Sequence, residues 1–364
     1  MPPTWSATTA CAEGSAAEML TKSDRFADSA SKIKDPFNVD PTMLFYSPQE
    51  NLDAFKHPRI AAYLEWIAED WTPPPGEPRL AVIIPCTKSK PYPTSLEHRA
   101  INGALMASGW TPDGRGRPPE ELYKVLDGGD PGNPDNDPRL LDVGTMTRNG
   151  VSLDRIVISE PLGLVPYTHV YEWDGGPSPA TSYDDPGLFE SRGTSVSPWR
   201  EDHTATLTAS GRWTWGPAER SAYVLAHNTL ADVIHRTLSR VGSRYGAIGA
   251  WTSPGLTHRS FLMGQAQRRA EKLPLSRIGV DGPVPLHGVC DETPGIVEIL
   301  PTTEQMAQAR TDLGQRLKHE GRNHSPGAVR GIYARGDGHD TPLGLPELLT
   351  HLTAWLDDRA AQLQ

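Results

Sequence analysis

The chain has 364 residues and a formal net charge of -10, from 35 Lys and Arg against 45 Asp and Glu. This acidic balance argues against a protein that coats nucleic acid by bulk electrostatics, although it permits a local basic cleft. No segment has the roughly 18 consecutive apolar residues of a membrane helix, and the N-terminus lacks a basic-then-apolar secretory signal. Its three cysteines are too far apart for a disulfide framework, so we expect a cytoplasmic protein with reduced thiols and no membrane partner.

The first part of the chain divides into a polar leader and the start of a folded domain. Residues 1–45 are small and polar with little periodicity, which predicts a mobile leader before a single α/β domain over 46–364. Residues 57–71 place apolar side chains at helical spacing and predict a helix that ends at a proline-rich break. The segment "RLAVIIP", residues 79–85, is continuously apolar and is typical of a central parallel strand.

The middle of the chain repeats this alternation. Residues 155–159 and 245–251 predict two further buried strands, and 171–216 is an irregular excursion with short strands at best. Residues 217–242 predict the longest helix. We expect its inner face to carry Val224, Leu225, Ala231, Val233, Ile234 and Leu238.

Helical segments dominate the C-terminal part. Residues 258–273, 303–319 and 345–361 predict helices, and 329–336 predicts a possible strand between the last two. Strands that alternate with helices favour a three-layer α/β/α domain around a mostly parallel sheet. In such sheets ligands bind beyond the carboxyl ends of the strands.

Reactive side chains gather directly after the first predicted strand, in "PCTKSKPYPTSLEH". Nearby ammonium groups such as Lys90 favour the nucleophilic thiolate form of a cysteine such as Cys86. His98 is a candidate proton donor or acceptor, because histidine titrates near neutral pH. The structural alternative is that Cys86 packs in the core, Lys90 extends along the surface and His98 caps a helix. Spacing alone does not decide between the two.

Segment Pro85–His98 reads Pro-Cys, three residues, Lys-Pro-Tyr, two residues, Ser, two residues, His. This pattern resembles the signature of the archaeosine synthase family, which modifies 7-cyano-7-deazaguanine. The flanking segments 57–74, 155–166 and 181–187 are similar to segments of that family, whereas the likeness is thin from Trp199 onward. Several positions at fixed spacing in a strand-then-loop context make the motif specific.

The resemblance implies a core related to the uracil-DNA glycosylase-like fold and an activity that adds an amine across the nitrile of the deazaguanine. It implies the catalytic candidates Cys86, Lys90, Tyr92, Ser95 and His98. It also implies the substrate-binding candidates Pro85, Ser159, Glu160, Leu162, Gly163, Asp184 and Asp185. No cofactor is implied by any motif.

Two mechanisms fit this chemistry. In the first, the Cys86 thiolate adds to the nitrile carbon to give a thioimidate, His98 or Tyr92 protonates the nitrogen, and Lys90 holds the thiolate or an anionic substrate group. In the second, the incoming amine attacks directly and Cys86 only lines the pocket. The attacking nucleophile could be lysine, ammonia or water, because changing it requires only a different second pocket.

The chain departs from the archaeal enzymes in two ways. It has no room for their transglycosylase-like and RNA-binding regions, so we expect the substrate as free base or in DNA, within a phage or bacterial base-modification pathway, and no tRNA. Glu160 is inserted in the "SEPLG" turn, where it could contact the N1–H and 2-amino group of the base or simply be a solvated turn residue. For Asp184 and Asp185, ordinary turn chemistry before Pro-Gly is the favoured interpretation.

Two other interpretations stay open. The chain could be a non-catalytic module of glycosylase-like fold that binds nucleic acid or a modified base, in which case loss of Cys86 and Lys90 would be tolerated. A zinc site built from His287 and Cys290 with Cys86 and His98 is a weaker alternative, because no Cys-x-x-Cys pair supports it.

Overall fold

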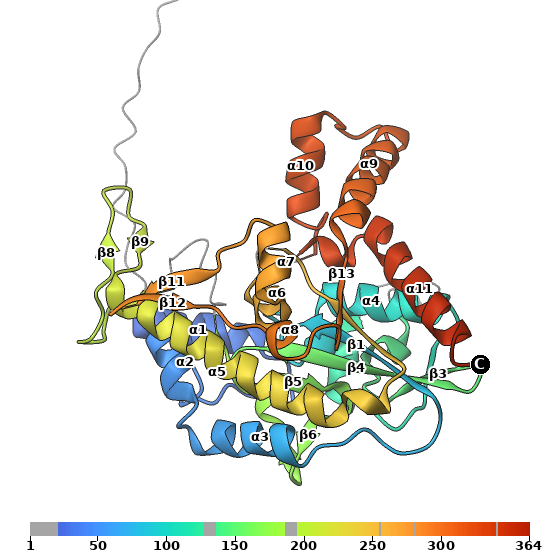
Figure 1. Ribbon diagram of the computed structural model, residues 1–364, viewed down its shortest axis with the longest axis horizontal. Coiled ribbons are helices and arrows are strands. Elements are labelled where there is room, and N and C mark those ends of the chain that lie inside the picture. The colour runs from blue at the N-terminus through green and yellow to red at the C-terminus, as the bar shows by residue number, and fades with distance from the viewer. Residues whose placement is uncertain (1–20, 127–135, 186–194, 255, 280, 340) are drawn as a thin grey trace, which may run out of the picture.

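The computed structural model describes residues 21–126, 136–185, 195–254, 256–279, 281–339 and 341–364. Its centre is a seven-stranded sheet in the order β13-β10-β1-β4-β3-β2, with β5 also paired to β4 (Figure 1). The strands are β1 (Arg79–Pro85), β2 (Thr111–Pro112), β3 (Met146–Arg148), β4 (Val151–Ser159), β5 (Gly163–Pro166), β10 (Ala247–Trp251) and β13 (Glu298–Leu300).

The four strands at the heart of the sheet run parallel. Strand β1 pairs in parallel with β10 on one side and β4 on the other, and β10 pairs in parallel with β13. Strands β3 and β5 pair antiparallel with the two halves of β4, and β2 pairs antiparallel with β3. The prediction of an α/β domain around a mostly parallel sheet is therefore confirmed at this level.

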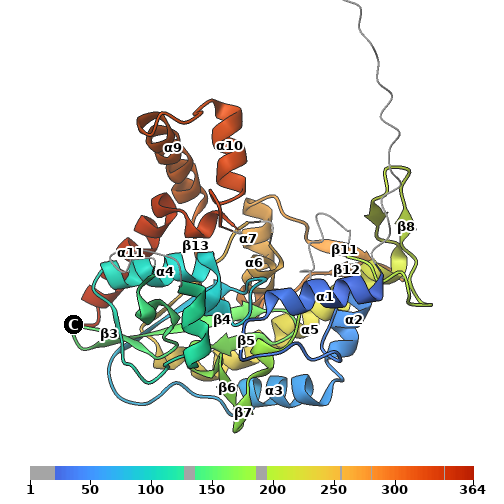
Figure 2. The same cartoon turned by 180° about the vertical axis from the view of Figure 1, so that it is seen from behind.

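Helices flank the sheet on both sides, with α3 and α5 along one side and α4 and α11 along the other (Figures 1 and 2). Helices α5 and α11 pack so closely on the sheet that two strand positions need small residues. A Cβ atom at Gly163 of β5 would lie 3.4 Å from Val233 of α5, and a Cβ atom at Gly249 of β10 would lie 2.7 Å from the Trp355 ring of α11. The helices are α1 (Lys22–Lys32), α2 (Pro48–Ala54), α3 (Pro58–Glu69), α4 (Leu96–Ala107), α5 (Pro217–Val241), α6 (Thr257–Leu262), α7 (Gln265–Ala270), α8 (Val289–Glu292), α9 (Thr303–His319), α10 (Pro326–Ala334) and α11 (Pro346–Ala361).

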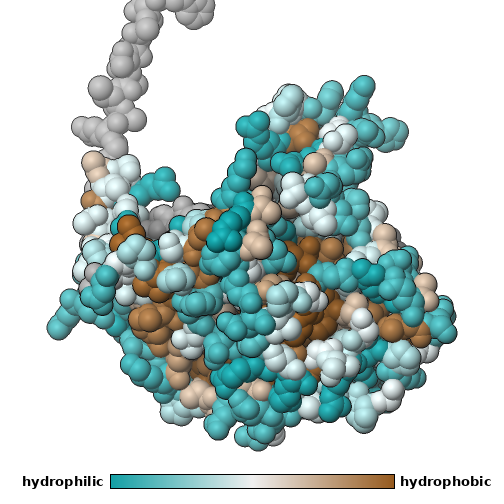
Figure 3. Space-filling view, viewed as in Figure 1, coloured by the Kyte–Doolittle hydropathy of each residue, from teal (hydrophilic) through white to brown (hydrophobic). Residues whose placement is uncertain are grey.

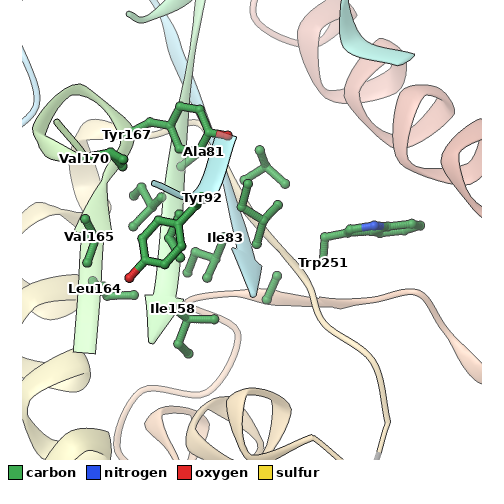
Figure 4. Close-up of a cluster of buried hydrophobic side chains, with 14 of the residues drawn as sticks. Ala81, Ile83, Tyr92, Ile158, Leu164, Val165, Tyr167, Val170 and Trp251 are labelled. Carbon is green, nitrogen blue, oxygen red and sulfur yellow. The ribbon is translucent and has the colours of Figure 1, made fainter. Parts of the chain in front are cut away.

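Strands β1 and β4 form the centre of the core, and every residue of both is buried. Side chains of β1, β4, β5 and β10 pack together with the buried rings of Tyr92 and Tyr167 (Figure 4). Burial of one large aliphatic side chain contributes about 1.5–3 kcal/mol, so this continuous apolar run holds the carboxyl edge of the sheet in place. The predicted strands 79–85 and 155–159 lie within β1 and β4.

The predicted mobile leader is wrong for residues 21–45, while residues 1–20 lie outside the described part of the chain. Helix α1 packs on the domain: Ser29 and Lys32 both donate hydrogen bonds to Asp184, and Ile33 forms a β-bridge with Lys90. The apolar residues of this stretch that become buried are few and widely spaced, which hid them from a periodicity argument. They are Ile33, Phe37, Met43 and Phe45.

The possible strand over 329–336 is also wrong, because most of this segment lies in α10. Ser325 caps the helix by accepting a hydrogen bond from the Ala328 amide, and Pro326 occupies its first turn. Val329, Ile332 and Tyr333 pack against the buried leucines of α9. Their spacing of three and four residues is helical rather than alternating.

Two smaller expectations about helices are corrected. Residues 258–273 form the two short helices α6 and α7 rather than one, because Gly264 interrupts them and caps the second with Gln267. Leu225, expected on the inner face of α5, is 52% exposed, whereas the five other predicted inner-face residues are buried. The other four predicted helices, over 57–71, 217–242, 303–319 and 345–361, match α3, α5, α9 and α11 to within a few residues, whereas α1, α2, α4 and α8 were not predicted.

The excursion over 171–216 holds only two-residue strands in its described part, while residues 186–194 lie outside it. Its hairpins are β6 (Glu172–Trp173) with β7 (Gly176–Pro177) and β8 (Thr206–Leu207) with β9 (Trp213–Thr214). Outside the excursion, β11 (Ser276–Gly279) and β12 (Gly282–Pro285) form another hairpin.

Helices α9 and α10 project from the body, and apolar residues gather below them on the face seen in Figure 3. Among the described residues, no helix combines the length and apolarity needed to span a bilayer.

Candidate active site

Three neighbouring parallel strands, β10, β1 and β4, bring reactive side chains to the carboxyl edge of the sheet. Cys86 follows the last residue of β1, and its amide extends the ladder by donating to the Ile158 carbonyl of β4 at 2.9 Å. Glu160 follows the last residue of β4. Strand β10 leads into α6, which carries His258. Ligands bind at this edge in open α/β sheets.

Cys86, His258 and Glu160 converge there. Sγ of Cys86 lies 3.4 Å from Nε2 of His258, and the same nitrogen lies 2.9 Å from Oε2 of Glu160. Glu160 is 2% exposed and His258 is 8% exposed, whereas Cys86 is partly exposed. The arrangement is thus a buried acid and base with a thiol at their open side.

Charge stabilises this group. Burial by itself would lower the pKa of His258, but the Glu160 carboxylate and the Cys86 sulfur outweigh it and raise the pKa of His258 well above 6.5. Burial would raise the pKa of Glu160, but His258 outweighs it and the pKa of Glu160 is lowered. The pair therefore exists as imidazolium and carboxylate at neutral pH, which places a positive charge beside the Cys86 sulfur.

The geometry differs from that of a Ser-His-Asp type triad. In such a triad the nucleophile and the carboxylate contact opposite nitrogens of the imidazole. In this chain both contact Nε2, and Nδ1 of His258 is buried without a hydrogen-bond partner among the described residues. His258 is therefore better placed to donate its Nε2 proton to a group bound beside the sulfur than to pass charge between the thiol and the carboxylate through opposite nitrogens of the ring.

A hydroxyl cluster adjoins the thiol. Tyr92 donates to Oγ of Ser159 at 3.3 Å, its hydroxyl lies 2.9 Å from that of Tyr183, and Ser159 and Tyr183 are also hydrogen-bonded. Burial raises the pKa of Tyr92 well above 10, and a negative charge on Cys86 raises it further. Burial also raises the pKa of Tyr183 well above 10, so both tyrosines stay protonated at neutral pH. Figure 4 shows Tyr92 beside the strands of this edge.

Lys90 is 2% exposed and its ammonium is directed at its own loop. It donates to the Thr87 carbonyl at 3.0 Å and lies 4.4 Å from the centre of the Tyr183 ring. We expected this ammonium to hold the thiolate or an anionic substrate group. Its contacts instead fix the loop that follows Cys86 and the ring of Tyr183.

His98 and Ser95 have structural roles. Both ring nitrogens of His98 are engaged, Nδ1 with the Tyr167 hydroxyl at 2.9 Å and Nε2 with the Pro85 carbonyl at 2.8 Å. Burial lowers the pKa of His98 to about 4. Ser95 caps α4 by accepting from the His98 amide at 3.1 Å. The proton transfer that we predicted for His98 is therefore better placed at His258.

The predicted substrate-binding residues divide between the edge and the core. Pro85 and Ser159 end β1 and β4 at the site, whereas Leu162 is buried in the core and Gly163 begins β5 where that strand packs on α5. The two aspartates differ as well. Asp184 accepts hydrogen bonds from Ser29 and Lys32 of α1 at 2.8 Å each. Asp185 lies near the hydroxyl cluster, since its charge adds to the effect of burial in raising the pKa of Tyr92.

Glu160 was expected to contact the base edge or to be a solvated turn residue. It is neither solvated nor directed outward, since its Oε2 contacts Nε2 of His258.

The zinc site suggested by the sequence would be built from a different set of residues. Among the described residues, the His, Cys and acidic side chains that converge are Cys86, Glu160 and His258, whereas Cys290 is buried in the hydrophobic core.

Two residues of the site were missed in the sequence. His258 received no role, although the helix that carries it follows the predicted strand 245–251 and so begins near the carboxyl edge of the sheet, where ligands bind. Tyr183 was passed over in favour of the aspartates that follow it. Its buried hydroxyl could be recognised only once Ser159 and Tyr92 were seen to surround it.

No family model, no curated protein and no solved structure matches the chain. The resemblance over Pro85–His98 therefore stands on its residues alone.

Proposed function

We propose that this protein is an enzyme that adds a nucleophile to the nitrile of 7-cyano-7-deazaguanine. The observation that carries the proposal is the contact of Cys86 with His258, which is held by Glu160 at the carboxyl edge of the sheet. A nitrile carbon is a weak electrophile, so it needs an activated nucleophile and a proton donor for its nitrogen. A thiolate beside an imidazolium supplies both.

The choice of substrate rests on the motif over Pro85–His98, whose likeness to the archaeosine synthase family is specific in spacing and context. The helices on both sides of the sheet agree with the three-layer α/β/α core, related to uracil-DNA glycosylase, that this likeness implies. The motif residues that do not reach the thiol, Lys90, Ser95 and His98, shape the loop that presents it.

In the first step the Cys86 thiolate attacks the nitrile carbon. The C–S bond forms, one π bond of the triple bond breaks, and its electron pair moves to nitrogen. The nitrogen takes the proton from Nε2 of His258, which leaves a thioimidate and a neutral imidazole. Before the transfer, the Glu160 carboxylate accepts a hydrogen bond from the protonated Nε2 and so orients the ring beside the sulfur.

In the second step an amine attacks the same carbon. Neutral His258 accepts the proton that the amine loses, the C–S bond breaks, and the Cys86 thiolate leaves with the bonding electron pair. The product is an amidine when the nucleophile is ammonia or an amine, and an amide when it is water. The Tyr92, Ser159 and Tyr183 hydroxyls form the polar cluster that adjoins Cys86.

The alternative in which the amine attacks directly uses the same proton donor but no C–S bond. It predicts that Cys86→Ala retains turnover, whereas the covalent mechanism predicts that turnover is lost and that a thioimidate adduct is trapped on the wild-type chain. Intact-protein mass spectrometry in the presence of the nitrile base and the absence of amine distinguishes the two.

The test of the function is direct. Purified protein is mixed with the nitrile base, free or in DNA, and with lysine, ammonia or water alone, and the product is analysed for a mass gain of one amine or one water. Cys290→Ala, which removes a thiol outside the site, is the matched control and should turn over normally. Tight binding of the base without any mass gain would instead show a non-catalytic module that recognises the base.

A further inference from the structure

The side chains at the carboxyl edge of the sheet have a second chemical property. A thiol, an imidazole and a carboxylate, from Cys86, His258 and Glu160, place their ligand atoms within 4.8 Å of one another. Cys86 and Glu160 directly follow β1 and β4, and His258 lies in α6, so three different segments hold the group. We infer that this group is a binding site for Zn²⁺.

Distances support the inference. Zinc binds sulfur at about 2.3 Å and nitrogen or oxygen at about 2.0–2.2 Å, so in a tetrahedral site the ligand atoms are about 3.4–3.6 Å apart. The separation of Sγ of Cys86 from Nε2 of His258 is 3.4 Å, and that of Nε2 from Oε2 of Glu160 is 2.9 Å. A shift of about 0.5 Å in the carboxylate therefore opens the group enough to hold the ion.

The donor set selects the metal. A thiolate and an imidazole are the ligands preferred by zinc, whereas magnesium and calcium prefer oxygen ligands alone. A thiolate and a carboxylate also carry two negative charges, which balance the charge of the ion. Because Glu160 and His258 are buried, this balance matters more than it would in water.

The number of ligands leaves one coordination position open. Catalytic and regulatory zinc sites commonly have three protein ligands and a fourth position for water or another small ligand. Cys86 is partly exposed, so an ion can reach the group from solvent. The site is therefore open rather than a closed structural one.

Zinc binding and the proposed reaction exclude each other. Because zinc binds only the neutral imidazole, an ion bound to Sγ of Cys86 and Nε2 of His258 occupies the nucleophile and displaces the Nε2 proton that the proposed reaction uses. If the proposed function holds, Zn²⁺ is an inhibitor that competes with thioimidate formation. The existence of the metal site does not depend on that function, because it rests on the three side chains alone.

Cobalt is the probe, since Zn²⁺ has no visible spectrum and Co²⁺ accepts the same ligands. Protein freed of metal by a chelator is titrated with Co²⁺ in the absence of any nitrile, and the absorption of the cobalt-thiolate bond is followed. We expect one ion per chain, displaced by Zn²⁺. Cys86→Ser should remove the thiolate band, His258→Asn should abolish stoichiometric binding, and Glu160→Gln should weaken binding but keep the band.

The double variant Cys11→Ala/Cys290→Ala is the matched control, since it leaves Cys86 as the single thiol of a chain with three cysteines. It should bind Co²⁺ like the wild type, and circular dichroism confirms that each variant is folded. Absence of a thiolate band in wild type, or a band that survives Cys86→Ser, overturns the site. Cobalt binding through Cys86 without nitrile turnover would support the metal site and refute the proposed function, whereas turnover without cobalt binding would do the reverse.

Discussion

Oε2 of Glu160 lies 2.9 Å from Nε2 of His258, and these two residues come from separate elements at the carboxyl edge of the sheet. The contact keeps a positive charge next to the Cys86 sulfur in a largely buried position. It is the relationship on which the proposed chemistry depends, and it leads to the first two predictions.

Glu160→Gln should lower kcat for nitrile addition by about 100-fold with a smaller effect on KM, because the amide keeps the shape of the side chain but not the charge that holds His258 protonated. Steady-state kinetics with the nitrile base checks this. Glu320→Gln, a change on an exposed carboxylate that pairs with Arg316 and Arg322, should leave kcat unchanged. Equal activity of Glu160→Gln and wild type would remove Glu160 from the mechanism.

We expect His258 to take part in the reaction and His98 to stabilise the fold. His258→Asn should reduce kcat by about 100- to 10,000-fold, as expected when a general acid is lost, while the fold is retained. His98→Gln should instead lower the melting temperature, because it breaks hydrogen bonds to Tyr167 and to the Pro85 carbonyl. Kinetics and thermal unfolding of both variants at a temperature where each is folded provide the measurement. The reverse pattern would restore His98 to the catalytic role.

Acid should destabilise the protein through His98. Burial lowers its folded-state pKa to about 4, with a lesser contribution from the Arg155 guanidinium, and the Tyr167 hydroxyl faces Nδ1. In the unfolded chain the pKa is about 6.5, so the unfolded state binds more protons as pH falls from about 6.5 to about 4 and stability is lost over that window. Between pH 7 and pH 5 the loss from this group is about 2 kcal/mol.

Urea unfolding of wild type and His98→Gln at both pH values measures that loss. The variant is less stable at pH 7, but its stability should fall less between pH 7 and pH 5, since the buried neutral imidazole is gone. His227, whose pKa burial lowers to about 3, remains in both proteins and contributes equally. Equal pH dependence of the two proteins would show that His98 does not govern acid sensitivity.

Asp184 should anchor helix α1. Its side chain is 1% exposed and accepts hydrogen bonds from Ser29 and Lys32 of that helix. Asp184→Ala should lower the free energy of unfolding by about 2–4 kcal/mol and speed hydrogen exchange in α1, because it removes the buried carboxylate that ties Ser29 and Lys32 of the helix to the domain. Asp28→Ala is the matched control: Asp28 pairs with the same lysine but is 67% exposed, so its loss should cost at most about 1 kcal/mol.

Much of the sheet could be predicted from local pattern. Strands β1 and β4 are continuous apolar runs, and a side chain one residue past such a strand must lie at the carboxyl edge. This reasoning placed Cys86 and Glu160 correctly without knowledge of the neighbouring chain. It could not orient Lys90 and His98, whose side chains are held by partners such as Tyr183 and Tyr167 from other elements.

The amino-acid sequence by itself determined the alternating pattern of the sheet domain and the reactive loop at the end of its first strand, because apolar periodicity and turn chemistry are local properties. Only the tertiary structure decided which base meets the thiol, since His258 lies 172 residues from Cys86 and the two approach through the pairing of β1 with β10. It also decided that α1 docks through Asp184, because that contact joins residues more than 150 positions apart. Contacts at such separations arise from packing and leave no periodic trace in the chain.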